Sequence, residues 1–456
     1  MELAKFDEYL DYLCGALGHS DRNGGLMDYC RGLMLPIERK SVEPLAAHTD
    51  PLHVRSKHQS LHHFVADSEW SDVPVLARVR DWVMPKLELE RGCYWIADDS
   101  GHPKYGKHSV GVAHQYCGNL GKTANCQVAV SLSVASERGS LPIDYRLYLP
   151  KEWAEDTTRR TKAGVPETIE FATKNAISLA QIRAAKAAGV TPGTVLADAA
   201  YGDDTAWREG LTELGLPYMV GIRPATSVWA PGVGPLPPKE WSGHGARPKR
   251  LRRAPGHEPT DVKSLALALP DNAWHVITWR EGTNASLSSR FACVRVSPAH
   301  QSHLATAMRP EEWLLVEWPN GDAEPLKYWL STGPSDATLA QLVFVAKMRW
   351  RIERDYRELK QEFGLSHYEG RNWRGFHHHA TLCIAAYGFL TASRLTHAPS
   401  QKNTSEPEML ALPSDYIPRG RPASPAPRAR LNQNASLGHR PTHRSPTASL
   451  PLLRRS

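Results

Sequence analysis

The stretch that decides the fold is apolar and ends in an acid: Tyr94-Trp95-Ile96-Ala97-Asp98. An apolar run without polar alternation is typical of a strand buried on both faces. A second stretch of the same kind, Val195-Leu196-Ala197-Asp198, follows farther along the chain. Around these two, the periodicity predicts strands over 127–134, 145–149 and 217–222 and helices over 171–188 and 205–214. This succession of strands and helices indicates a mixed α/β fold built on a layered sheet.

Outward from this core, the pattern divides the chain further. Residues 1–90 show helical spacing and predict a small helical domain, which either contacts DNA or only packs on the core. Pro and Gly interrupt the next region, 225–335, which predicts a β-rich insertion between the core segments 91–224 and 336–395. In the second core segment we expect one long helix over 339–363 and another over 379–395. The remaining 396–456 is rich in Pro, Ser and Arg and predicts a disordered basic tail.

The composition excludes several classes of protein. The 456 residues carry a formal net charge of +7, which favours an acidic partner such as nucleic acid. The sequence has no run of 18 apolar residues, so we expect no membrane span, and its start lacks the apolar core of a signal peptide. Seven cysteines lie singly, without CxxC spacing, which indicates reduced thiols in the cytoplasm.

Three acids are candidates for metal chemistry. Asp98 and Asp198 follow two predicted buried strands, and ligand sites of layered sheets lie at strand ends. Glu353 lies in a predicted helix that places Arg349, Arg357 and Lys360 on the same face. Cleavage of a phosphodiester uses two divalent cations held by carboxylates, with Arg and Lys to bind the phosphates. The three acids therefore predict a phosphodiester-cleaving site.

Each acid also has an ordinary structural interpretation. An Asp that follows a strand is commonly a turn former or a helix N-cap. A Glu between arginines, such as Glu353, is commonly half of a surface ion pair. The functional hypothesis rests on the order of the three features along the chain, which is strand and Asp, strand and Asp, then helix and Glu.

The spacing Arg349-(3)-Glu353-(6)-Lys360 resembles the Y-R-E-K signature of cut-and-paste transposases from bacterial insertion sequences. The stretches at 96–101, 196–202 and 350–370 look like one sub-branch of that group. The resemblance runs from the N-terminus to about residue 395. It implies an RNase H-like catalytic core with an Asp-Asp-Glu triad and a β-rich insertion before the Glu helix.

By that resemblance, Asp98, Asp198 and Glu353 hold two Mg²⁺ or Mn²⁺ ions, and Arg349 and Lys360 contact DNA phosphates. The family has its Tyr three residues before the Arg, where this chain has Ala346, and Tyr356 is the candidate substitute. Asp98 is favoured over Asp99 as the first ligand. The family's Asp-x-Ser/Thr spacing fits Asp98, and Asp99 would point to the opposite side of a continued strand.

Other residues are weaker candidates for DNA binding. Lys104 and Lys107 follow the first Asp in a Gly-containing loop, and either bind phosphate or are simply solvated. Arg250 and Arg252 belong to a compact basic run over 247–253 that either contacts DNA or forms ordinary surface. Trp329 lies where some relatives stack a flipped base, and it is equally a candidate for the core.

The sequence therefore predicts a DNA transposase. It would hydrolyse phosphodiester bonds at transposon ends and transfer the freed 3′-hydroxyl into target DNA. The resemblance implies a homodimer on two paired double-stranded DNA ends, located in the bacterial cytoplasm at the nucleoid. Two alternatives stay open: a metal-dependent DNA nuclease of the same fold without strand transfer, and a catalytically silent DNA-binding repressor.

Overall fold

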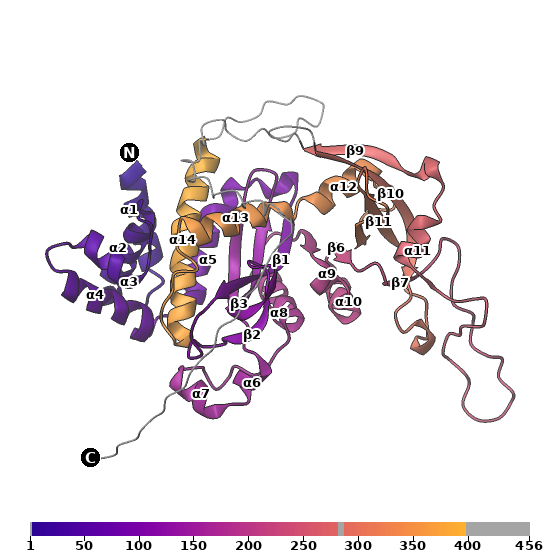
Figure 1. Cartoon of the computed structure of the whole chain (residues 1–456), viewed down its shortest axis with the longest axis horizontal. Coiled ribbons are helices and arrows are strands. Elements are labelled where there is room, and N and C mark those ends of the chain that lie inside the picture. Colours follow the sequence, from indigo (N-terminus) through magenta and orange to yellow (C-terminus); the bar gives the residue numbers. More distant parts are fainter. Residues whose placement is uncertain (1, 281–286, 398–456) are drawn as a thin grey trace, which may run out of the picture. The chain divides into compact units, whose positions relative to one another are not determined.

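The computed structural model of the chain describes residues 2–280 and 287–397 (Figure 1). The predicted tail lies outside the described residues from residue 398 onward, and its first two residues instead belong to the last helix. None of the described helices is both long and apolar enough to cross a membrane. Together these residues form a mixed α/β structure with a large mixed sheet.

The N-terminal region is helical. Its helices are α1 (Glu2–Cys14), α2 (Asn23–Met34), α3 (Val42–Thr49), α4 (Val54–His62) and α5 (Asp72–Val83). The helical domain that the sequence predicts over 1–90 is thus confirmed as helical in its secondary structure, and the helical spacing of apolar residues is clearest in α1, α2 and α5. Helices α3 and α4 are shorter and bury few side chains. Four short turns of helix also lie in this region: Ser20–Arg22, His63–Asp67, Met84–Lys86 and Leu89–Arg91.

The core of the sheet has both parallel and antiparallel strands. They are β1 (Tyr94–Pro103), β3 (Lys122–Ala135), β4 (Ser140–Leu147), β5 (Thr194–Ala197) and β6 (Tyr218–Ile222). Strand β3 pairs antiparallel with both β1 and β4, whereas β5 runs parallel to both β1 and β6. The hairpin partner β2 (Ala113–Cys117) adds to the outer end of β3.

Strand β1 is longer than the sequence predicted. It was expected to end at Ala97, but it pairs with β3 over ten residues, from Tyr94 to Pro103. Its parallel pairing with β5 covers only Tyr94 to Ile96. Asp98 therefore lies in the middle of β1, just beyond the point where the parallel ladder stops. That point is the carboxyl edge of the parallel strands, so the predicted location at a strand edge still holds.

The strand-rich segment continues the same sheet. It contains β7 (Ser227–Trp229), β8 (Thr260–Asp261), α11 (Val262–Leu267), β9 (His275–Arg280), β10 (Leu287–Pro298), β11 (Glu312–Trp318) and β12 (Lys327–Ser331). Strand β12 pairs antiparallel with β6, so the segment extends the core sheet by backbone hydrogen bonds. Its remaining strands follow in the order β12, β11, β10, β7 and β8, with β9 on β10.

The helices of the core connect and cover these strands. They are α6 (Lys151–Ala154), α7 (Thr157–Lys162), α8 (Lys174–Ala187), α9 (Ala199–Gly202), α10 (Thr205–Glu213), α12 (Leu339–Lys347), α13 (Trp350–Gln361) and α14 (Trp373–His397). The prediction of one long helix over 339–363 was wrong, because the chain breaks at Met348 and Arg349 into α12 and α13. Helix α14 lies beside α5 (Figure 1) and contacts α2, α5 and β4, which explains why it is buried nearly all around.

Gly202 provides a test of how tightly α9 packs on β6. A Cβ atom at this position would lie 1.9 Å from the carbonyl oxygen of Gly221. Because backbone cannot move aside cheaply, we expect Gly202→Ala to lower the free energy of unfolding by about 1–3 kcal/mol in a denaturant titration. Gly106→Ala is the control, since a Cβ there meets nothing within 4 Å. Equal stability of the two variants would contradict this packing.

Asp355 provides a test of pH dependence. Its carboxyl group accepts hydrogen bonds from Ser140 Oγ and, at 2.7 Å, from Tyr387 Oη, and it thereby joins α13 to β4 and α14. Burial raises the pKa of Asp355 to about 6, although both hydrogen bonds oppose this. The folded pKa exceeds the unfolded one, so the stability from this group is complete below about pH 4 and is lost as the pH rises through 6.

We therefore expect Asp355→Asn to remove a pH-dependent loss of about 3 kcal/mol between pH 4 and pH 7. The measurement is the free energy of unfolding of the wild type and the variant across this range. Contributions from other groups cancel in the difference between the two proteins. Parallel pH profiles would show that the Asp355 carboxyl ionises normally in the folded chain.

Candidate active site

Asp98 is a mostly buried carboxylate with one strong partner. Its side chain is 20% exposed, and its Oδ2 atom accepts a hydrogen bond from Arg349 Nη1 at 2.8 Å. Burial raises the pKa of Asp98 to about 7. The Arg349 guanidinium opposes this rise and the neighbouring Asp198 carboxylate reinforces it. Arg349 is thus the counter-charge of an acid that the sheet removes from water.

Asp198 follows β5 and is the neighbour of Asp98 across the parallel strands. Its Oδ1 atom accepts a hydrogen bond from the Ala200 backbone N–H at 2.9 Å, which makes Asp198 the N-cap of α9. The structural interpretation of this acid is therefore correct for one of its oxygens. The capping bond fixes the orientation of the side chain beside Asp98.

Glu353 lies in the first turn of α13 and is joined to Asp98 through one arginine. Its Oε1 atom accepts a hydrogen bond from Arg349 Nη2 at 3.1 Å, while Nη1 of the same guanidinium binds Asp98. The Glu353 side chain is 59% exposed. Arg349 thus bridges an acid of β1 and an acid of α13.

Asp99 points to the other side of β1. Its Oδ2 atom accepts a hydrogen bond from Lys174 Nζ at 2.6 Å, at the start of α8. Successive residues of a strand alternate between the two faces, so Asp98 and Asp99 cannot both face Asp198. The geometry therefore places Asp98, and not Asp99, with Asp198 and Arg349.

The donor chemistry of this site suits a hard divalent cation, since all three acids offer carboxylate oxygens. Over residues 2–280 and 287–397, no three His, Cys, Asp or Glu side chains lie close enough together to hold a metal ion. Arg349 accounts for this spacing, because its guanidinium lies between Asp98 and Glu353. Asp98 and Asp198 are within electrostatic range of each other, and their carboxylate oxygens are of the kind that such a cation prefers.

Four of the predicted basic residues lie close to this edge or in the loop that follows Asp98. Lys360 of α13 is within electrostatic range of Asp98, and burial lowers the pKa of its ammonium group. Arg357, also on α13, is exposed to solvent. In the loop after β1, Lys107 is exposed, whereas Lys104 Nζ donates to the Tyr368 carbonyl at 2.6 Å. Lys104 thus already binds the segment that leads from α13 into α14.

Two predicted DNA contacts are buried instead. Tyr356 is 8% exposed and packs in the core beside the Tyr145 ring, because it projects from α13 toward the sheet. Trp329 is 9% exposed in β12, and the Lys347 ammonium lies 5.6 Å from its ring centre. Tyr356 is therefore a core residue and not the exposed DNA contact that was predicted, and of the two interpretations of Trp329 the structure supports the core one.

The basic run lies on the loop between β7 and β8. Arg250 is fully on the surface, and Arg252 is half-buried with its Nε atom donating to the Pro237 carbonyl at 2.8 Å.

The sequence analysis missed two residues that lie near the candidate carboxylates. Lys174 pairs with Asp99 from a distant helix, for which no local signal exists. Tyr201 is buried within electrostatic range of Asp98, Asp99 and Asp198, and its position one helical turn after Asp198 was the available signal.

Comparisons with known proteins bear on this geometry. A family model described as "DDE superfamily endonuclease" matches residues 12–286, a range that includes Asp98 and Asp198 and ends before Glu353. A probable transposase for insertion sequence element IS701 from Microchaete diplosiphon is 33% identical over 166 residues, which is 36% of this chain and only 40% of the relative.

A solved structure is also similar in part. The NurA nuclease from Sulfolobus solfataricus aligns with 59% of this chain and 81% of its own, at 8% identity and a TM-score of 0.25. This likeness is too low to bear on fold or function.

The N-cap role of Asp198 yields a stability prediction. Asn is as good an N-cap as Asp, so we expect Asp198→Asn to unfold at the wild-type denaturant concentration, whereas Asp198→Ala loses about 1 kcal/mol. The measurement is equilibrium unfolding of the full chain without divalent metal. If Asp198→Asn were as unstable as Asp198→Ala, the capping bond would not be what holds this side chain. Asp198→Asn is accordingly the better variant for removing the carboxylate alone.

Proposed function

The chain belongs to the DDE superfamily of endonucleases, and from that premise we propose that it is the transposase of a bacterial insertion sequence. The observation that carries the proposal is that Arg349 joins Asp98 to Glu353, while Asp198 lies within electrostatic range of Asp98. Two of these acids lie on neighbouring parallel strands, and the third lies on the helix that Arg349 begins. The relative named as a probable transposase supports the same function.

The catalytic core would be RNase H-like. The strand order β3, β1, β5, β6, with β4 beyond β3, supports this assignment, since β1, β3 and β4 are antiparallel and β5 and β6 run parallel to β1. In this proposal, residues 1–90 form a helical domain that binds the transposon end. The strand-rich 225–335 interrupts the core between its two aspartates and its glutamate.

Asp98, Asp198 and Glu353 would hold two Mg²⁺ or Mn²⁺ ions. Divalent cations bound there polarise the phosphodiester and stabilise the charge on the attacking and leaving oxygens. Because Arg349 pairs with both Asp98 and Glu353, it is positioned to exchange these carboxylates for a DNA phosphate when the substrate arrives. Lys360, near Asp98, would hold the adjacent phosphate, and exposed Arg357 would contact the backbone farther out.

The reaction is a pair of phosphoryl transfers. In the first, water attacks phosphorus at the element's end, the bond to the 3′ oxygen breaks, and that oxygen leaves as a hydroxyl. In the second, this hydroxyl attacks a phosphodiester of target DNA and displaces another 3′ oxygen. Lys104, Lys107, Arg250 and Arg252 are proposed contacts for the double-stranded DNA, and a homodimer would bring two ends together at the nucleoid in the cytoplasm.

The central test separates Asp98 from Asp99. We expect Asp98→Asn to reduce Mg²⁺-dependent nicking of an end-containing DNA by at least about 100-fold, because it removes a metal-holding carboxylate. Asp99→Asn is the matched control and should nick near the wild-type rate, since Asp99 faces Lys174. Nicking by Asp98→Asn at the wild-type rate would contradict the assignment.

A strand-transfer assay distinguishes the transposase from the two alternatives, a nuclease and a repressor. With a pre-cleaved end and a target plasmid, a transposase yields joined product. Cleavage without joining would indicate a metal-dependent nuclease, and DNA binding without either reaction would indicate a repressor.

A further inference from the structure

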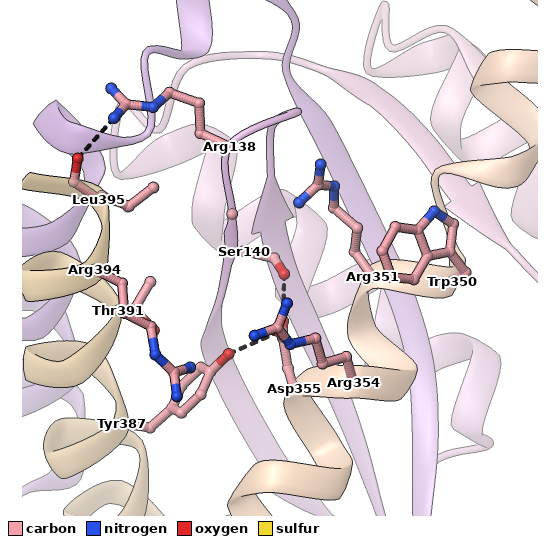
Figure 2. Close-up of a pocket in the computed structure, with 11 residues that line it drawn as sticks. Arg138, Ser140, Trp350, Arg351, Arg354, Asp355, Tyr387, Thr391, Arg394 and Leu395 are labelled. Carbon is pink, nitrogen blue, oxygen red and sulfur yellow. Dashed lines mark hydrogen bonds between the residues drawn. The ribbon is translucent and has the colours of Figure 1, made fainter. Parts of the chain in front are cut away.

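A hollow lined by arginines lies between α13, α14 and the turn that joins β3 to β4 (Figure 2). Its guanidinium groups come from three elements. Arg351 and Arg354 belong to α13, Arg394 belongs to α14, and Arg138 comes from the turn between β3 and β4. On α13, Arg351 lies two residues before Glu353, which puts the two side chains on opposite faces of the helix. The hollow is therefore separate from the candidate active site.

The positive charge of this hollow is only partly balanced. Arg354 Nε and Arg394 Nη1 share one carboxylate, that of Glu358, at 3.1 and 2.6 Å. Arg138 pairs with Glu88. Arg351 donates to the Glu137 carbonyl, and within the described part of the chain it has no carboxylate at ion-pair distance. Four guanidinium groups thus share two paired carboxylates.

Asp355 is the one acid among the residues that line the hollow, and with its charge included four guanidinium groups still face only three carboxylates. Asp355 also already accepts hydrogen bonds from the hydroxyls of Ser140 and Tyr387 (Figure 2). Two further polar atoms line the hollow without a hydrogen-bond partner among the described residues: Arg351 Nε and Thr391 Oγ1. Thr391 is only 6% exposed. A buried donor left unpaired is costly unless a ligand satisfies it.

We propose that this hollow binds a phosphate group. A phosphate offers several acceptor oxygens and negative charge, which match unpaired N–H and O–H donors and an excess of guanidinium groups. The planar guanidinium group of Arg can bind two such oxygens at once. Arg354 and Arg394 can donate their N–H groups to a phosphate once they release the Glu358 carboxylate. The phosphate belongs either to a DNA backbone or to a free phosphorylated molecule. A phosphate bound in the hollow would restrain α13 on the face opposite Glu353 and so stabilise the position of the helix that carries Glu353.

The test uses the full chain in EDTA, with inorganic phosphate as the probe. Thermal unfolding is followed against phosphate concentration, with chloride added to keep the ionic strength equal. We expect phosphate to raise the melting temperature of the wild type. Arg394→Gln, at a side chain that is 44% exposed, should weaken the apparent phosphate affinity by about ten-fold or more.

We expect Glu358→Gln to strengthen phosphate binding, which is the opposite of the effect of Arg394→Gln. The neutral side chain frees Arg354 and Arg394 and removes a competing negative charge, so phosphate should bind about five-fold tighter. If the arginines served only to clamp α13 to α14, Glu358→Gln would lower the melting temperature and leave the phosphate response unchanged. Because this test rests on a gain, it stays decisive even if Arg394→Gln is unstable. Arg183→Gln, at an exposed position on α8, is the control.

The proposal is overturned if phosphate acts no differently from chloride on the wild type, or if Arg394→Gln and Glu358→Gln leave the response unchanged. Binding of a short DNA duplex at several salt concentrations then identifies the source of the phosphate. If the site takes a DNA phosphate, Arg394→Gln lowers the slope of log affinity against log salt by about one. An unchanged slope, with lost phosphate binding, assigns the site to a free phosphorylated molecule. Neither measurement depends on DNA cleavage.

Discussion

The arrangement of this protein depends on one ion pair, between Asp98 and Arg349. A carboxylate within a sheet is deprived of water, and its charged form needs a cation close by. The cation comes from a residue 251 positions farther along the chain. Because Arg349 also binds Glu353, the same contact sets the position of α13 against β1. The two halves of the core are joined at the place where the chemistry is proposed.

Helix α13 works through both of its faces. One face carries Glu353, Arg357 and Lys360 and begins at Arg349, which binds Asp98. The other carries Arg351 and Asp355 toward β4 and α14, where Asp355 is held by two hydroxyls. The break between α12 and α13 at Met348 gives α13 its own direction and places Arg349 at its start. A helix restrained on one face can present its other face to a substrate with little loss of precision.

Much of the fold could be predicted from the sequence because local patterns determine it. The buried runs before Asp98 and Asp198 and the periodicity of α8 and α10 depend only on nearby residues. Contacts between distant segments could not be predicted in this way. The extension of β1 depends on β3, the pairing of Asp99 depends on Lys174, and the burial of Trp329 depends on Lys347 and on the strands beside it. Tyr356 was misassigned for the same reason: helical spacing gives a face, and only packing shows which way it points.

We propose that Asp98 and Asp198 form one cation site at the edge of the parallel strands, with Glu353 as the third carboxylate. The most direct measurement is a crystal structure of the chain soaked in Mn²⁺, with anomalous scattering used to locate the metal. We expect an anomalous peak bonded to oxygens of both Asp98 and Asp198, and Arg349 displaced from Asp98. A peak held by Asp99, or Mn²⁺ bound without either of the two aspartates, would contradict it.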